Sequence, residues 1–147
     1  MYTALLATHN VVRWLVLASG FWAMARAWGG WRSRAVWTGA DAAAGQRFVQ
    51  ATSLQFVIGL VLYAVSPLIR QGVADMGAAM RDPALRTFLV EHPLMMLLSI
   101  ALVHIGSARV RKATSDSGRF QAATVWWGLG VTSLLAMMPW ARRLLPF

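Results

Sequence analysis

The sequence predicts an all-α fold, an integral membrane four-helix bundle with both termini on the outer side. Apolar residues make up 58% of the 147 residues and charged residues only 13%, whereas about a quarter of the residues are charged in an average soluble domain. Long charge-free runs alternate with short basic segments, and each crossing of a bilayer needs roughly 20 mainly apolar residues. The length therefore predicts one domain, residues 1–147, with about four spans.

The predicted spans cover about residues 4–27, 46–67, 86–108 and 119–141. The first span is interrupted only by Arg13 and Arg26. No basic region precedes it and no clear cleavage site follows it, so we expect a retained span and not a signal peptide. There is no internal repeat and no long polar linker, which favours a single bundle.

Residues that begin helices stand at the expected boundaries. Asp41 is expected to cap the second helix, and Asp82 is followed by Pro83, a residue that suits the first helical position. Asp116 or Ser117 can cap the last span. All elements are therefore predicted to be helices.

The distribution of basic residues predicts the orientation. Two loops that share one side of the membrane hold eight basic residues, which are Arg26, Arg32, Arg34, Arg47, Arg109, Arg111, Lys112 and Arg119. The opposite side holds five, which are Arg70, Arg81, Arg86, Arg142 and Arg143. Because basic loops stay on the cytoplasmic side, both termini should face outward. The net charge of +9 then indicates contact with anionic lipid head groups, not with nucleic acid.

The sequence lacks the residues that several kinds of site require. No cysteine is present, which excludes thiolate ligands, disulfides and cysteine nucleophiles. The sequence contains no phosphate-binding loop, no dinucleotide fingerprint and no HExxH motif, and it has only five acidic residues. An independent enzyme is therefore less expected than a carrier or an accessory subunit.

Two histidines match in depth and are the candidate metal ligands. His9 lies about five residues, or roughly 7 Å, inside the first span from its outer end, and His92 follows Arg86 by six residues from the same side. Two neutral imidazoles on different helices of a bundle could bind haem iron from opposite faces of the ring. The alternative is that each histidine only bonds to water or to a backbone carbonyl.

Arg13 and Glu91 are polar residues at the same predicted depth. Arg13 lies four residues after His9, so it shares that helix face, and its side chain leans toward the outer surface. An arginine at mid-span costs about 2.5–3.5 kcal/mol and needs a partner. The candidates are Glu91 and a haem propionate, and Glu91 could also orient an imidazole.

Pro93 cannot donate a hydrogen bond to the carbonyl of Leu89. We therefore expect a kinked helix near Glu91 and His92, or a helix that ends there and restarts at Pro93. Met95 and Met96 follow by one turn and would line the resulting space, although methionine more often serves as flexible packing.

A possible inner-side site surrounds His104. This residue is twelve positions after His92, which is about 18 Å along a helix and about 120° around it. The polar residues at that level in the second span are Thr52, Ser53 and Gln55, which are poor iron ligands. We expect no second bis-histidine haem, while a five-coordinate haem on His104 or a quinone head group near Ser53 and Gln55 stays open.

Three motifs together resemble a family of small four-span bacterial membrane proteins described as cytochrome-b-like. They are His9-x3-Arg13-Trp14, the run LQFVIGLVLYAVSP at 54–67 and EHPLMMLL at 91–98. The resemblance extends over essentially the whole chain, including Pro139-Trp140, and implies haem b in a bacterial inner membrane. Members often carry histidine at the position of Ser53. That departure implies that one haem site is lost here or uses another partner.

The favoured interpretation is a b-type cytochrome-like electron carrier, or a cytochrome subunit that feeds a quinone or a larger membrane enzyme. Its haem iron would be held by His9 and His92. The alternative is a haem-free accessory or scaffold subunit of a respiratory, photosynthetic or transport complex. In that case Arg13, Glu91 and His92 would form an internal polar clasp that fixes helix packing.

Overall fold

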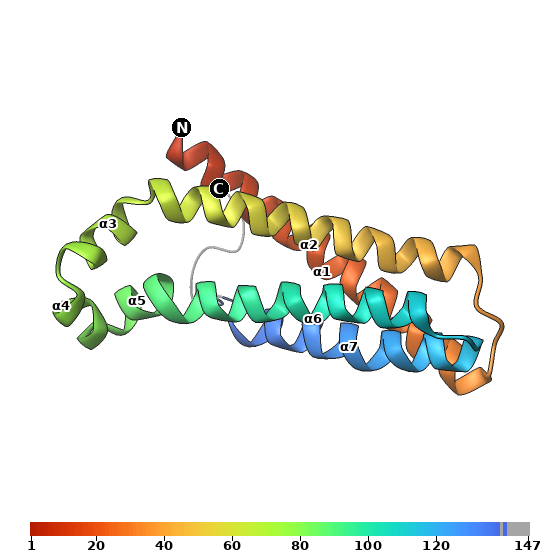
Figure 1. The fold of residues 1–147 in the computed structure, drawn as a ribbon. Coiled ribbons are helices and arrows are strands. Elements are labelled where there is room, and N and C mark those ends of the chain that lie inside the picture. The colour runs from red at the N-terminus through yellow and green to blue at the C-terminus, as the bar shows by residue number, and fades with distance from the viewer. Residues whose placement is uncertain (139, 141–147) are drawn as a thin grey trace.

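The computed structural model describes residues 1–138 and residue 140, and all regular structure in this part of the chain is helical. The four long helices are α1 (Tyr2–Ser33), α2 (Gly39–Val65), α6 (His92–Lys112) and α7 (Asp116–Ala136). Figure 1 shows α6 and α7 side by side, with α1 crossing behind the other long helices at an angle. The connection from α2 to α6 contains α3 (Pro67–Ala74), α4 (Met76–Arg81), α5 (Pro83–Arg86) and the π-helical turn η1 (Thr87–Glu91). Arg142 and Arg143, which entered the predicted orientation, and the end of the fourth predicted span lie outside the described residues.

The bundle has two different ends, as Figure 1 shows. The N-terminal end holds the start of α1, the short helices α3 to α5 and the start of α6. The loop end holds the two short connections, residues 34–38 between α1 and α2 and residues 113–115 between α6 and α7. The eight basic residues of the prediction belong to the loop end and its adjacent helix turns.

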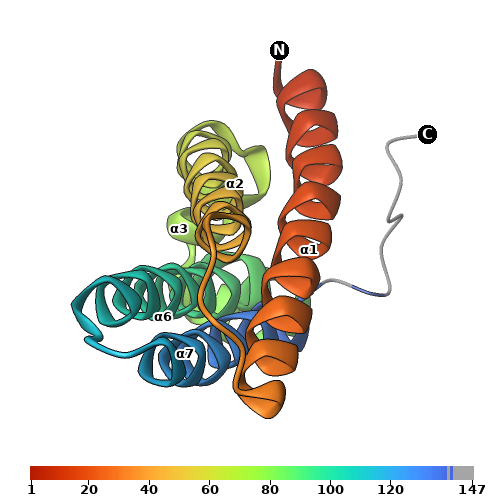
Figure 2. The ribbon, with the colours of Figure 1, turned by 90° about the vertical axis from the view of Figure 1, so that its right-hand side faces the viewer.

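The helices pack in a ring in which α1 contacts α2 and α7, while α6 contacts α7 and α2. The helices α1 and α6 are therefore diagonal to each other, as the end view in Figure 2 also indicates. The core along their shared axis is apolar and includes Val16, Phe48, Val103, Trp127 and Val131. Residues of α1 and α6 that face this axis can approach each other across the bundle.

The Trp127 side chain of α7 packs against a glycine of α2 and a glycine of α6. A Cβ atom on Gly45 of α2 would lie 2.0 Å from the six-membered ring of the Trp127 indole, and one on Gly106 of α6 would lie 2.8 Å from its five-membered ring. These distances are far too short for a real contact, so only glycine fits at both positions. Close helix approach through small residues is typical of helix packing in membranes.

Three helical runs are long and apolar enough to cross a membrane, and they are Tyr2–Ser33, Gly39–Val65 and Pro83–Lys112. They extend the first three predicted spans at their ends by two to seven residues, apart from the second, which stops two residues early. The prediction of membrane insertion is thus supported by the length and composition of these three helices.

The helix starts partly correct the sequence analysis. Asp82 caps α5 by accepting from the amides of Ala84 and Leu85, and Pro83 occupies the first helical position as predicted. The prediction for α2 was wrong, because Thr38 is the N-cap and Asp41 stands three residues inside the helix, where its carboxylate accepts from the Thr38 amide at 2.8 Å. The cap of α7 is Ser115, not Asp116 or Ser117.

Pro93 is accommodated by a π-helical turn within one continuous run from Pro83 to Lys112. Of the two expected forms, the structure therefore has a single locally distorted helix and no break. The Tyr63 hydroxyl of α2 donates to the Leu89 carbonyl at 2.9 Å. This is the carbonyl that Pro93 cannot serve, so a side chain from another helix replaces the lost backbone donor.

Candidate functional site

His9 and His92 lie near each other toward the N-terminal end of the bundle. His9 lies on α1 and His92 opens α6, the two diagonal helices. Both side chains are half-buried, and the two imidazoles lie close enough to interact electrostatically. The two imidazoles that the sequence predicts at one depth therefore lie near each other, and the depth itself stays a prediction.

The His92 ring is oriented by the backbone. Its Nδ1 lies 3.2 Å from the carbonyl oxygen of Met137, just after α7. A carbonyl can only accept, so Nδ1 carries the proton in this bond and a neutral ring has its lone pair on Nε2. Metal-bound histidines are commonly oriented in this way, with one ring nitrogen donating to a carbonyl and the other bound to the metal.

The surroundings of His9 contain unsatisfied polar atoms and a small residue. Its Nδ1 is buried without a hydrogen-bond partner among the described residues. Gly59 of α2 lies beside it, since a Cβ there would be 3.3 Å from the His9 ring carbon Cε1. Buried polar atoms without partners are rare in folded proteins and frequently mark binding sites.

Gln55 belongs to this cluster and not to the inner-side site that the sequence analysis assigned to it. Its side-chain nitrogen donates to the His9 backbone carbonyl at 3.0 Å, while its oxygen Oε1 is buried and has no partner in the described part of the chain. The correction follows from helix geometry. Gln55 and Ser53 differ by two positions, or about 200° around α2, so they face different helices.

Arg13 lies close enough to both histidines to interact electrostatically with each. Its guanidinium also lies 5.7 Å from the centre of the Trp14 ring. The cluster around the two imidazoles therefore carries a positive charge, which suits an anionic group such as a carboxylate bound beside them.

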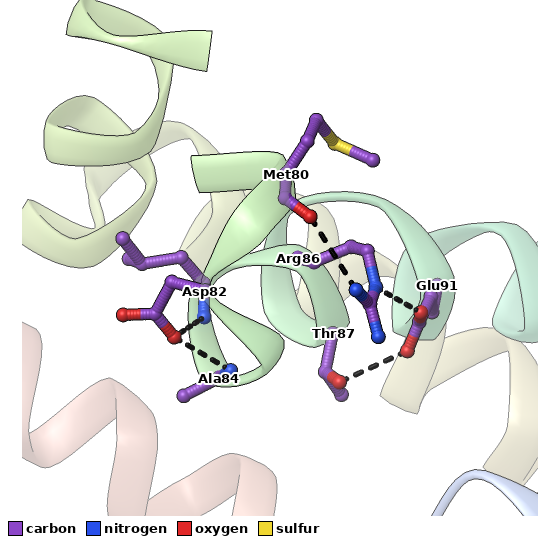
Figure 3. A network of polar contacts seen from close by, with 7 residues as sticks. Met80, Asp82, Ala84, Arg86, Thr87 and Glu91 are labelled. Atoms are coloured by element: carbon purple, nitrogen blue, oxygen red, sulfur yellow. Dashed lines mark hydrogen bonds and ion pairs between the residues drawn. The ribbon is translucent and has the colours of Figure 1, made fainter. Parts of the chain in front are cut away.

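Glu91 forms its ion pair with Arg86, in place of the expected pair with Arg13. The Arg86 Nε donates to Glu91 Oε1 at 2.7 Å, and the Thr87 hydroxyl donates to Oε2 at 2.9 Å (Figure 3). The π-helical turn explains the pairing, because its wider turn places residues five apart on the same face. Glu91 therefore stabilises the turn that leads into His92, and its proposed contact with an imidazole stays a prediction.

Met95 and Met96 lie half-buried on α6, one turn after His92. The Met95 carbonyl accepts from the Ser99 hydroxyl at 2.7 Å, and Ser99 in turn bonds to Ser133 of α7. These bonds involve the Met95 backbone and not its side chain, so the role of the two methionine side chains stays a prediction.

Ser53 and His104 form a second polar pair nearer the loop end. The Ser53 hydroxyl donates to the Val49 carbonyl at 2.8 Å, so its oxygen accepts from His104 Nε2, 3.0 Å away. The His104 side chain is exposed on the outside of the bundle. The pair links α2 to α6 and lies apart from the cluster of His9 and His92.

Three parts of the site were not found from the sequence. The Met137 carbonyl is a backbone atom and has no residue signature, and Tyr63 contacts Leu89 from 26 residues away. Gly59 was overlooked although an isolated glycine within a helix often indicates close approach of another group.

The cluster suits a haem better than a bare metal ion. Among the described residues, no group of three or more His, Asp or Glu side chains could hold an ion, and an ion bound by protein alone usually needs three or four such ligands. A haem brings four nitrogen ligands of its own and needs one or two imidazoles. His9, His92 and the positive charge of Arg13 fit those needs, and the missing side chain of Gly59 lets the His9 ring approach α2.

Comparisons of the chain with protein-family models, curated proteins and solved structures gave no match. The resemblance to cytochrome-b-like proteins therefore stays a prediction from the sequence.

Proposed function

We propose that this protein is a four-span membrane electron carrier that binds one haem b between His9 and His92. The observation that carries the proposal is that two half-buried imidazoles from diagonal helices lie close enough to interact electrostatically. It is supported by the Met137 carbonyl, which leaves His92 Nε2 available, and by the orphaned Nδ1 of His9. In a bacterium the site would belong to the inner membrane, where such carriers pass electrons between quinone and larger enzymes.

The proposal includes α7 as the fourth span. With 21 residues it is about 31 Å long, which matches a hydrocarbon core of about 30 Å. No charged residue follows Arg119 within α7. Two of its polar residues, Thr124 and Ser133, are buried against the bundle and so lower its hydropathy without facing lipid, whereas Gln121 and Thr132 are exposed.

The orientation in this proposal follows the basic residues. Eight of them lie at the loop end or in the adjoining helix turns, which would place that end in the cytoplasm. The cluster of His9 and His92 would then lie in the outer half of the membrane, toward the compartment that both termini face.

The chain's own residues would bind and orient the cofactor. His9 and His92 would hold the haem iron in their neutral form, and the Met137 carbonyl would keep the His92 ring in the tautomer whose Nε2 is free to bind it. Arg13 would offset the charge of a propionate. Haem b, when bound, supplies the one-electron redox chemistry.

The test is visible spectroscopy of protein purified from haem-replete cells in a mild detergent. The reduced-minus-oxidised spectrum should show a sharp b-type band that is lost in His9→Ala and His92→Ala. His104→Ala is the matched control, because it removes the third imidazole of the chain at a site remote from the cluster. This variant should keep the band.

A colourless, folded preparation would overturn the haem proposal. It would favour the alternative of a haem-free accessory subunit, in which the bond of His92 to Met137 and the pair of Arg86 with Glu91 only fix helix packing. A band that survives both histidine variants and disappears in His104→Ala would place the haem elsewhere and would equally refute the assignment of His9 and His92.

A further inference from the structure

A hollow at the loop end lies between the last turns of α6 and the first half of α7. It has a volume of about 280 Å³ and is lined by Arg109, Gly118, Gln121, Ala122, Val125 and Trp126. It is far from the cluster of His9 and His92, which lies near the opposite end of the bundle. Nothing in the proposed electron-carrier function requires it.

The residues that line the hollow change from polar to apolar along α7. Its five α7 residues recur at intervals of three or four, so they lie on one face of the helix. From Gly118 to Trp126 the helix advances by eight residue steps, or about 12 Å. The polar members, Gln121 and Arg109, lie nearer the helix ends, while Ala122 and Val125 continue the surface toward the middle of the span.

The charge at this place is strongly positive. Residues 109–119 contain four basic side chains, which are Arg109, Arg111, Lys112 and Arg119, and one acidic side chain, Asp116. Two of the basic groups are already engaged, because Arg111 donates to the Ser107 hydroxyl at 2.9 Å and Arg119 lies 3.7 Å from Asp116.

Arg109 differs from these neighbours. Its guanidinium lies 5.8 Å from the centre of the Trp126 ring, and no hydrogen bond or ion pair joins it to another described residue. The side chain is exposed. It therefore presents unused donors in the hollow and is positioned by stacking on the indole.

We propose that this hollow binds the head group of an anionic phospholipid. Arg109 and Gln121 would donate to the phosphate oxygens, and the first part of an acyl chain would follow Ala122, Val125 and the Trp126 ring toward the middle of the span. The complementary charge selects an anionic over a zwitterionic lipid. The apolar continuation of the hollow selects a lipid over free phosphate.

The experiment measures thermal unfolding of the detergent-solubilised protein during titration with phosphatidylglycerol, with phosphatidylcholine, or with inorganic phosphate. Phosphatidylglycerol should raise the melting temperature saturably, and the other two ligands should not. Arg109→Gln should shift the midpoint of the phosphatidylglycerol titration to roughly tenfold higher lipid, as expected for the loss of one charge-assisted contact.

Arg111→Gln is the matched control, since it removes the same charge two residues away and should leave the midpoint unchanged. Val125→Trp adds no charge but fills the hollow, so it should also weaken the effect of phosphatidylglycerol. Equal losses in the two arginine variants would show diffuse attraction and overturn the proposal. An equal response to phosphatidylcholine, or to phosphate alone, would do so as well.

Discussion

The hydroxyl of Tyr63 is expected to replace the hydrogen bond that Pro93 removes from its helix. Tyr63→Phe deletes only this hydroxyl and leaves the Leu89 carbonyl without the donor at 2.9 Å. Loss of a partner from a buried carbonyl costs about 1–3 kcal/mol. Leu89 is 4% exposed but Tyr63 is 38% exposed, and side-chain bonds between membrane helices average about 0.6 kcal/mol. We therefore expect a loss of about 1 kcal/mol in the free energy of unfolding.

The assay is equilibrium unfolding by SDS in mixed micelles, followed by circular dichroism. Tyr2→Phe, which changes the other tyrosine of the chain, is the control and should leave the free energy of unfolding unchanged. Pro93→Ala completes a double-mutant cycle. It supplies a backbone N–H that can donate to Leu89 in an α-helical register, so Tyr63→Phe should cost close to nothing in that background.

Equal costs of Tyr63→Phe in the two backgrounds would refute this reasoning. They would mean that the hydroxyl stabilises the bundle independently of Pro93. A cost of zero in the natural background would refute the bond itself.

Two further predictions concern packing and charge, measured by the same unfolding assay. Gly45→Ala places a Cβ 2.0 Å from the Trp127 indole and should lower the free energy of unfolding by about 1–3 kcal/mol through overpacking. Gly29→Ala is the control, because a Cβ there meets nothing within 4 Å, and it should raise the free energy of unfolding by about 0.5–1 kcal/mol. Equal effects of the two variants would contradict the close packing of Trp127 against Gly45. Asp41→Asn should cost about 1–2 kcal/mol, because the buried carboxylate accepts from Arg26 at 2.8 Å, although that arginine is 36% exposed and keeps part of its hydration. A loss below about 0.5 kcal/mol would instead show a pair as weak as a surface ion pair.

The helices could be predicted because their signals are local. Apolar runs set the three helical runs that can cross a membrane, and the pair of Asp82 with Pro83 marks the start of the third. The cap of α2 was readable too, since Thr38 and Asp41 have the spacing of a capping box. In a capping box the acidic residue stands three positions after the hydroxyl residue that caps the helix, so Asp41 marks Thr38 as the cap.

The histidine pair was predictable for a different reason. Counting residues from the same end of two helices that run in the same direction gives the expected depth of a side chain, and this count is similar for His9 and His92. Depth does not give the direction around a helix. Gln55 was therefore assigned to the group of Ser53, whereas the structure turns it toward His9.

The remaining features depend on contacts between distant segments. Pro93 predicts a distorted helix, but not that the distortion is a π-helical turn. The Leu89 carbonyl in that turn accepts from the Tyr63 hydroxyl of α2, a contact that the local sequence cannot reveal. For the same reason, the ion-pair partner of Glu91 in the structure is Arg86 and not the expected Arg13. Only a π-helical turn brings Arg86, five residues earlier, onto its face.

The wedge of Trp127 between Gly45 and Gly106 has a consequence for how such a sequence can evolve. The three positions lie on three helices, and the Trp127 indole fills the space that a side chain at Gly45 or Gly106 would need. A side chain gained at either glycine is tolerated only if position 127 becomes smaller at the same time, since cores accept changes that conserve volume. A smaller residue at 127 alone leaves a cavity. The three positions should therefore be inherited as a set, and substitutions at them should covary among sequences that adopt this fold.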